Sequence, residues 1–342
     1  MEIMNYSDVV SKIKKENRVF NLLMGNGFSV AYDPSIFSYN ALYKFVVDND
    51  SDGVSELFDI FKTTNFELIM QQLDITKKIA AKFGASKEVI AKIGHAEDLL
   101  KNNLVQAIKD LHPEHVFKIA EEKSLGCADF FKLFLDKNGE IFTSNYDVLM
   151  YWVLMRNGIP GVSDGFGREY DPDEEFDEGA DLTWGKNSDI QNIHYLHGAL
   201  PLFDNGLDIV KETYTNNDFL VNRIRKRIDA GHYPVFVSAG TGKEKLNQIR
   251  HNPYLAYCYD RFSKIEGSLV TFGFNFGEFD NHIIHAINNA AKLRKKKKLY
   301  SVYIGVYSDD DIAHIEKIKS KFKNIKIHVF ETKSATVWKK LD

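Results

Sequence analysis

The chain has 342 residues, of which 44% are hydrophobic and 27% are charged, and its formal net charge is −4 at pH 7. This composition is typical of globular proteins, and the acidic balance argues against a general nucleic-acid-binding protein. The two cysteines, Cys127 and Cys258, are too few for a disulfide framework or a four-thiolate zinc site. There is no signal-peptide core and no apolar run of membrane-spanning length, so we expect a cytoplasmic protein that does not bind membranes.

The N-terminal part predicts a buried strand that ends in a glycine turn. We expect an amphipathic helix over residues 7–15 and a strand over residues 18–24, followed by the sequence GNGFS from Gly25 to Ser29. Gly25 and Gly27 would allow positive φ angles and close approach of a ligand, and a helix beginning there would point free N–H groups at an anion. A nucleotide phosphate is the expected ligand, although a tight strand-to-helix turn alone has the same pattern.

Residues 41–137 have helical periodicity and contain no convincing strand. Apolar residues recur at helical intervals at Ile90, Ile93, Leu100, Leu104 and Ile108. We therefore predict a helical insertion domain over residues 41–137 and a second domain formed by residues 1–40 and 138–342.

Strands and helices alternate through the rest of the chain. The expected strands are residues 140–144, 192–196, 234–238, 268–273, 299–306 and 325–330, and the expected helices are residues 147–155, 217–229, 254–265, 280–293 and 309–322. Residues 157–189, with an acidic cluster at 171–178, are expected to form a loop-rich lid or excursion. The alternation predicts an α/β protein with a doubly wound, Rossmann-like parallel sheet and the helical insertion after its first strand. Ligands of such sheets bind beyond the carboxyl ends of the strands.

Four polar motifs follow predicted strands and would therefore meet at one edge of the sheet. They are GNGFS (25–29), TSNYD (143–147), LHG (196–198) and GFNFGEFD (273–280). Taken singly, each motif has another explanation, because Asn and Asp often cap helices and glycine often ends a strand. Their joint placement, with one histidine among them, favours a ligand site.

The order and spacing of these motifs resemble the sirtuin-like family of NAD-consuming proteins, and within it the bacterial branch associated with phage defence. In that family a glycine turn followed by serine binds the dinucleotide phosphates, which implies NAD contacts for Gly25, Asn26, Gly27, Phe28 and Ser29. The family's Thr-x-Asn-x-Asp motif corresponds to Thr143, Asn145 and Asp147. Its catalytic histidine, followed by glycine, corresponds to His197.

A later strand of that family ends in glycine and contacts the ribose and adenine, and it is similar to the segment of Gly273, Phe274 and Asn275, with Asp280 opening the next helix. The sequence departs from the deacylases of the family in two respects. It lacks their four zinc-binding cysteines, and residues 37–39 lack the arginine of their Asp-Phe-Arg segment. Both departures argue against protein deacylation and leave NAD cleavage possible.

The resemblance implies an NAD glycohydrolase (NADase) that releases nicotinamide and ADP-ribose, with NAD as substrate and no metal. The bond breaks through a ribosyl oxocarbenium cation, and the nicotinamide leaves as a neutral ring. As a hypothesis, Asp147 and the backbone around Tyr146 hold the carboxamide, and Asn145 positions the ribose and the attacking water. A histidine has an ordinary pKa of about 6.5, so His197 would accept a proton. The rival explanations are a histidine satisfied at the sheet edge and an asparagine that only caps a helix.

Other functions have weaker support in the sequence. A dehydrogenase fingerprint would need a third glycine where Val30 lies, and the P-loop-like segment 238–244 has Glu244 where Ser or Thr binds Mg²⁺. His194 and His197 would point to opposite faces of a strand, and His282 and His285 have no evident third ligand, so we expect no metal site. The main alternative to an NADase is a non-catalytic sensor of NAD or ADP-ribose. By resemblance, such chains form homo-oligomers and some work beside a HerA-type ring ATPase.

Overall fold

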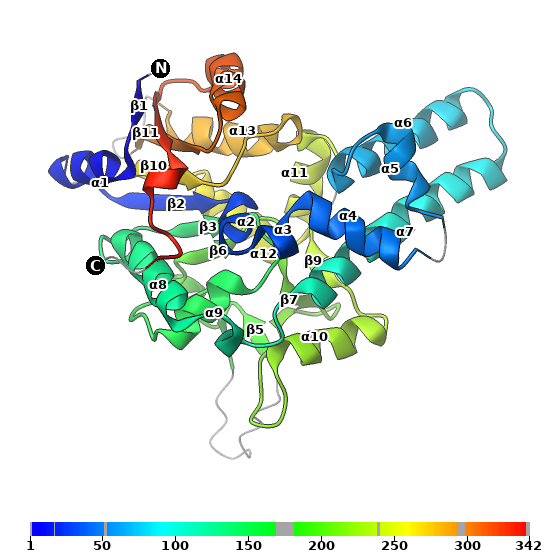
Figure 1. The fold of residues 1–342 in the computed structure, drawn as a ribbon, viewed down its shortest axis with the longest axis horizontal. Coiled ribbons are helices and arrows are strands. Elements are labelled where there is room, and N and C mark those ends of the chain that lie inside the picture. Colours follow the sequence, from blue (N-terminus) through cyan, green and yellow to red (C-terminus); the bar gives the residue numbers. More distant parts are fainter. Residues whose placement is uncertain are drawn as a thin grey trace.

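A parallel sheet of seven strands forms the centre of the molecule (Figure 1). The computed structural model describes residues 2–16, 18–50, 53–168, 181–237, 240–292 and 298–339. Its order is β1-β12-β11-β10-β2-β3-β6, and every pair of neighbours is parallel. The strands are β1 (Ile3–Met4), β2 (Phe20–Met24), β3 (Ile141–Thr143), β6 (Ile193–Tyr195), β10 (Gly267–Phe272), β11 (Leu299–Val306) and β12 (Lys326–Glu331).

The strand order reverses between β2 and β10. Leaving out the edge strand β1, the strands follow the chain in the order 3-2-1-4-5-6, which is that of the Rossmann fold. The predicted doubly wound α/β fold is therefore confirmed. At the reversal, neighbouring strands are followed by chain segments that leave in opposite directions, and a crevice opens between them.

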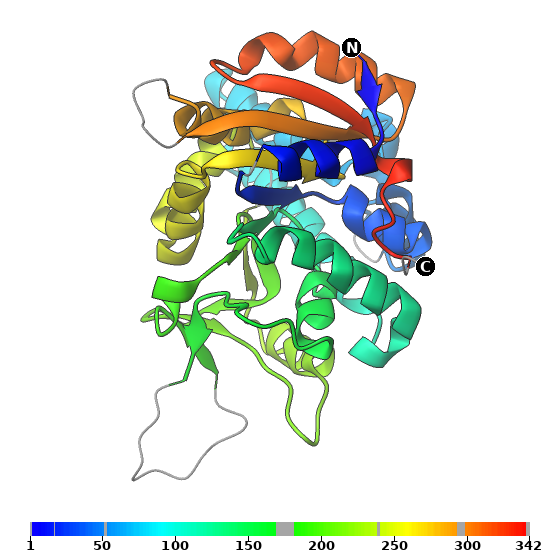
Figure 2. The same ribbon diagram turned by 90° about the vertical axis from the view of Figure 1, so that its left-hand side faces the viewer.

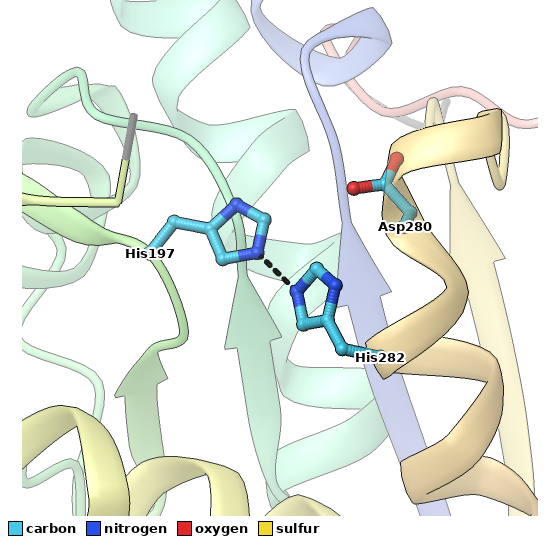
Figure 3. Close-up of side chains that lie close together, drawn as sticks. All are labelled: His197, Asp280 and His282. Atoms are coloured by element: carbon cyan, nitrogen blue, oxygen red, sulfur yellow. Dashed lines mark hydrogen bonds between the residues drawn. The ribbon is translucent and has the colours of Figure 1, made fainter. Parts of the chain in front are cut away.

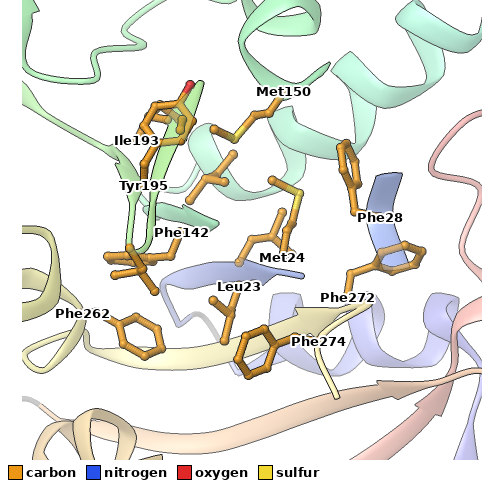
Figure 4. Close-up of a cluster of buried hydrophobic side chains, with 14 of the residues drawn as sticks. Leu23, Met24, Phe28, Phe142, Met150, Ile193, Tyr195, Phe262, Phe272 and Phe274 are labelled. Atoms are coloured by element: carbon orange, nitrogen blue, oxygen red, sulfur yellow. The ribbon is translucent and has the colours of Figure 1, made fainter. Parts of the chain in front are cut away.

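The central strands β2 and β10 of this sheet are buried on both faces. All five residues of β2 and all six of β10 are buried, because helices cover each side. Leu23 and Met24 of β2 pack among aromatic side chains such as Phe142 and Phe272 in the hydrophobic core (Figure 4). This continuous apolar run explains why the strand could be found from sequence.

Helices cover both faces of the sheet. Figure 2 shows α1 in front of the strands, and α8 packs against β2 and β3. The rings of Tyr6 of α1 and Phe130 of α8 have centroids 5.9 Å apart, so the two helices are in contact. Helix α12 packs on α13, and the Tyr259 hydroxyl donates to the His282 carbonyl at 2.9 Å. The helices outside the β2–β3 connection are α1 (Tyr6–Lys15), α9 (Leu149–Arg156), α10 (Leu220–Asp229), α11 (Gly242–His251), α12 (Pro253–Phe262), α13 (Asn281–Ala290) and α14 (Asp309–Ile318), with 3₁₀ turns η2 (Ser188–Ile190), η3 (Glu278–Asp280), η4 (Lys319–Lys321) and η5 (Thr332–Ser334).

The connection from β2 to β3 consists of helices joined by turns, and its described residues form no strand. It contains α2 (Gly27–Tyr32), α3 (Pro34–Phe37), α4 (Tyr39–Asp48), α5 (Glu56–Phe61), α6 (Phe66–Lys82), α7 (Lys87–Leu111), η1 (Val116–Lys118) and α8 (Glu121–Leu135). Helices α4 to α7 contribute a second hydrophobic cluster, and Ile108 contacts both this cluster and the main core. Helices α6 and α7 project from the body of the molecule (Figure 1). Division into two domains stays a prediction.

A second, antiparallel sheet corrects the sequence prediction. Its order is β4-β5-β8-β7-β9, with β4 (Phe166–Gly167), β5 (Leu182–Trp184), β7 (Gly198–Asp204), β8 (Ile209–Lys211) and β9 (Pro234–Phe236). The strand expected at 234–238 is therefore not part of the parallel sheet, because short apolar runs do not distinguish the two kinds of pairing. The predicted excursion 157–189 contributes β4 and β5. Its acidic cluster, residues 171–178, lies outside the described residues, as do Ser238 and Ala239.

None of the helices in the described ranges combines the length and apolar character required to cross a bilayer.

Candidate functional site

Two glycine turns meet at the point where the strand order reverses. A Cβ on Gly25 would lie 2.5 Å from the Gly273 carbonyl oxygen, and a Cβ on Gly27 would lie 2.6 Å from Gly273 Cα. Neither Gly25 nor Gly27 has a positive φ, whereas Gly273 has a φ of 65°. The predicted close approach is therefore to a second segment of the chain, and the prediction of positive φ angles in the first turn is wrong.

The backbone amides of the first turn are mostly engaged within the protein. Gly25 N donates to Phe272 O at 3.1 Å and Gly27 N donates to Gly273 O at 3.0 Å. The amides of Phe28 and Ser29 donate to carbonyls of the turn itself. The expected cradle of free N–H groups is thus not formed by these four residues, because the two loops close on each other.

A chain of side-chain hydrogen bonds joins Asn145 to Asp147 through Ser29. Asn145 Nδ2 donates to Ser29 Oγ at 2.9 Å, and Ser29 Oγ donates to Asp147 Oδ2 at 2.5 Å. An ionised carboxylate only accepts, so the serine must use its own hydrogen on Asp147 and accept from Asn145. This direction fixes the amide, and Asn145 Oδ1 is left buried without a hydrogen-bond partner among the described residues.

Backbone contacts hold these two side chains in place. The Asn145 amide donates to Thr143 Oγ1 at 3.0 Å, and the Leu149 amide donates to Asp147 Oδ1 at 2.9 Å. The Val148 amide donates to Nε2 of the buried His112 at 3.2 Å. The TSNYD segment is therefore a rigid turn that presents Asn145 and Asp147.

His197 pairs with a second buried histidine, His282. Their Nε2 atoms are 2.9 Å apart, and Nδ1 of His197 points away from His282 (Figure 3). Burial, aided by His282 and Lys245, holds the pKa of His197 well below its usual value. Burial and then Lys245 lower the pKa of His282 to about 3, against an opposing backbone interaction with Phe279. Both imidazoles are therefore neutral at pH 7, and the ordinary pKa expected for His197 is wrong.

Asp280 lies beside this pair and completes a group of possible metal ligands. One ligand atom each from His197, Asp280 and His282 lies within 4.8 Å of the others. The sequence paired His282 with His285 and showed no third ligand, whereas the fold places His282 beside potential ligands from distant segments. His285, expected as its possible partner, is exposed on α13 and is not in the group. His194 contacts Glu140 Oε2 at 2.7 Å instead.

A cavity connects these groups. Its volume of about 1220 Å³ is larger than the roughly 300–1,000 Å³ of most small-molecule sites. The predicted site residues that line it are Gly25, Asn26, Gly27, Asn145, Asp147, His197, Gly273, Phe274, Asn275 and Asp280. Phe28, Ser29 and Thr143 are buried and do not line it. The ring of Phe28 packs on Trp338, and the two hydroxyls support Asn145, so these three residues position the site from behind.

Several cavity residues were not predicted from sequence. They come from the end of β11, the C-terminal segment and the helical connection, and they include Phe66, Lys123, Tyr307, Lys333 and Trp338. The Lys123 ammonium lies 4.8 Å from the Tyr32 ring centroid, and that of Lys333 lies 4.5 Å from the Tyr307 ring centroid. No sequence motif distinguishes these lysines from others on the surface.

The P-loop-like segment forms a helix start. Thr241 and Glu244 make a reciprocal capping box at the beginning of α11, and Glu244 also pairs with Lys78 of α6 at 2.7 Å. Glu244 is therefore committed to capping and to an ion pair.

Comparison with protein families identifies one that covers almost the whole chain. A model described as a domain of unknown function, DUF4917, matches residues 22–338. The chain belongs to the DUF4917 family. No curated protein matches it. The matched region of this DUF4917 chain begins within β2 and ends at Trp338, so it includes all the cavity residues named above.

Proposed function

We propose that this protein is an NAD glycohydrolase that cleaves NAD to nicotinamide and ADP-ribose. The observation that carries the proposal is that Asn145, Asp147 and His197, which come from two separate motifs, line one cavity beside the paired glycine turns. The cavity lies at the reversal of the strand order, where Rossmann-like proteins bind dinucleotides. The resemblance of the motifs to sirtuin-like NAD-consuming proteins supports the same substrate.

The polar groups suit a reaction with a cationic transition state. Asn145 Oδ1 is an acceptor with no hydrogen-bond partner in the described part of the chain, so it can bind a ribose hydroxyl or the attacking water. The Asp147 carboxylate lines the cavity and can hold the nicotinamide carboxamide while its charge stabilises the ribosyl cation. Neutral His197 can take the proton that water loses as it attacks.

Nicotinamide release measured with purified protein tests the proposal. We expect Asn145→Ala and His197→Ala to lower the rate by at least about 100-fold, which is the lower end of general acid–base contributions. Asn49→Ala and His285→Ala are matched controls, because both residues are exposed and neither lines the cavity. Wild-type rates in both folded site variants would refute the assigned roles.

A non-catalytic sensor of NAD or ADP-ribose is the second candidate. The lowered pKa of His197 favours it, because a histidine that resists protonation is a weak proton acceptor at pH 7. Calorimetric titration with NAD, run beside the nicotinamide assay, separates the two. If NAD binds but no nicotinamide is released, even by the protein assembled with its activating trigger or partner, the result supports the sensor.

The biological setting follows from the same resemblance. As an NADase, the protein would deplete NAD during phage defence, as a homo-oligomer and with a HerA-type ring ATPase as a possible partner. Measuring its mass in solution, alone and with NAD, tests the oligomer.

A further inference from the structure

Three potential metal ligands converge between the parallel sheet and its helices. His197 follows β6, Asp280 ends η3, and His282 lies in the first turn of α13. Figure 3 shows both imidazoles meeting through their Nε2 atoms with the Asp280 carboxylate directed toward the same space. Both histidines are almost fully buried, with 3% and 2% of their surface exposed, so their orientation is fixed by packing.

The spacing of these atoms is close to that of a metal site. Metal–nitrogen bonds of roughly 2.0–2.1 Å at tetrahedral angles place two ligand nitrogens about 3.3 Å apart. The two Nε2 atoms are 2.9 Å apart and the whole group spans 4.8 Å. A small movement of Asp280 and a slight separation of the rings would admit an ion. Two imidazoles and one carboxylate, with a fourth position open, match the ligand set of catalytic-type zinc sites.

We propose that His197, His282 and Asp280 bind a divalent zinc ion. His197 and Asp280 line the cavity, so the ion can enter from it and take water or a substrate group as its fourth ligand. An imidazole binds metal through a ring nitrogen that carries no proton, and the Nε2 atoms of both histidines face the same space.

Lys245 is the charge that faces this group most directly. Its side chain is fully buried and its ammonium lies 3.5 Å from Asp280 Oδ1. This contact is longer than a usual charge-assisted hydrogen bond of roughly 2.7–2.9 Å. The positive charge of Lys245 repels a bound cation and so lowers the affinity of the site. Lys245 also orients one oxygen of the Asp280 carboxylate, as outer partners of metal ligands do.

Zinc at this position would change the chemistry of His197. An imidazole that binds metal through Nε2 carries its proton on Nδ1, which is the nitrogen that points away from His282. His197 could then donate a proton to a ligand but not accept one. Zinc would thus inhibit NAD cleavage; this consequence rests on the proposed function, whereas the binding of zinc does not.

The binding experiment uses the full-length chain freed of metal with a chelator. Zinc affinity is measured by competition with a chromophoric chelator, and Co²⁺ replaces zinc to reveal four-coordinate geometry in its visible spectrum. We expect one equivalent to bind the wild type and His285→Gln, whose changed histidine is exposed on the same helix. His282→Gln and Asp280→Asn should bind at least about 100-fold more weakly, since even outer partners are worth roughly 10–100-fold.

The melting temperature, measured with and without zinc, tests binding to variants that fold poorly. Zinc should raise the melting temperature of the wild type and of His285→Gln, and should not raise that of His282→Gln or Asp280→Asn. Absence of a saturable site in the wild type, or wild-type affinity in both ligand variants, overturns the proposal. If zinc binds but no protein sample releases nicotinamide, the zinc site stands and the proposed NADase activity fails.

Discussion

Ser29 Oγ donates a 2.5 Å hydrogen bond to Asp147 Oδ2, although 118 residues separate the two in the chain. Ser29 belongs to α2, directly after the glycine turn, and Asp147 follows β3. The bond therefore joins the segments after two neighbouring parallel strands. Because Ser29 also accepts from Asn145, one fully buried hydroxyl determines the position of both polar groups that face the cavity.

Replacing Ser29 with alanine should destabilise the protein and impair its site. The change removes the hydroxyl that links Asn145 Nδ2 to Asp147 Oδ2, and a buried charged group that loses a partner costs about 1.5–3 kcal/mol. Urea denaturation measures the loss. Ser35→Ala is the matched control, because Ser35 is exposed, and it should change stability by less than about 0.5 kcal/mol. Equal stabilities of the two variants would contradict this account.

Alanine should have opposite effects at Gly27, which lies in the contact between the glycine turns, and at Gly94, which lies outside it. Gly27→Ala should destabilise by about 1–3 kcal/mol, because its Cβ would overlap the Gly273 backbone. Gly94 lies in α7, where the nearest described atom to an added Cβ is Lys77 Cδ at 4.0 Å, so Gly94→Ala should stabilise the helix by roughly 0.5–1 kcal/mol. Denaturation curves of both variants check the signs. A stable Gly27→Ala protein would show that the turns are not in contact.

Stability should decrease as the pH falls below about 6.5, the ordinary histidine value. Burial lowers the folded-state pKa of His112, His194, His197 and His282, so the unfolded chain binds more protons in this range. Each histidine contributes up to about 1.4 kcal/mol per pH unit until the pH reaches its folded pKa, which is about 3 for His282. The unfolding free energy is measured from pH 7 downward in the presence of a chelator.

Replacing His112 tests how much one histidine contributes to the slope of unfolding free energy against pH. His112→Gln keeps an acceptor for the Val148 amide and removes one titrating group. The number of protons taken up on unfolding, which sets the slope, should therefore be smaller by up to one. Stability that is constant, or that rises, between pH 6.5 and 5 would be inconsistent with neutral buried histidines.

Trp338 should anchor the C-terminal segment to the site. Its Nε1 donates to Phe28 O at 2.9 Å, and its ring lies 4.8 Å from that of Phe28 and 5.0 Å from that of Tyr32. Trp338→Ala should cost about 3–5 kcal/mol, whereas Trp338→Phe, which keeps an aromatic ring, should cost only about 1–2 kcal/mol. Calorimetric melting compares them. An alanine variant as stable as the phenylalanine variant would show that the segment is not docked.

The fold class followed from local patterns that tertiary structure did not alter. The apolar run of β2 and the strand at 299–306 were located from sequence because strands covered on both faces are apolar throughout. Of the antiparallel sheet, only β9 was expected as a strand, and its pairing was not. The strands β4, β5 and β8 were missed because they have only two or three residues each and give no usable period, and β7 was missed as well.

The sequence by itself determined the Rossmann-like arrangement and the motifs that end at one edge of its sheet, because period and turn chemistry are local properties. Only the tertiary structure decided which motif residues face the cavity and which support it, as Ser29 and Thr143 do. It also decided that His197 meets His282 and Asp280, since that meeting depends on how α13 packs beside the β6–β7 turn. Residues so far apart in the chain are brought together by packing, and no local pattern records their distance.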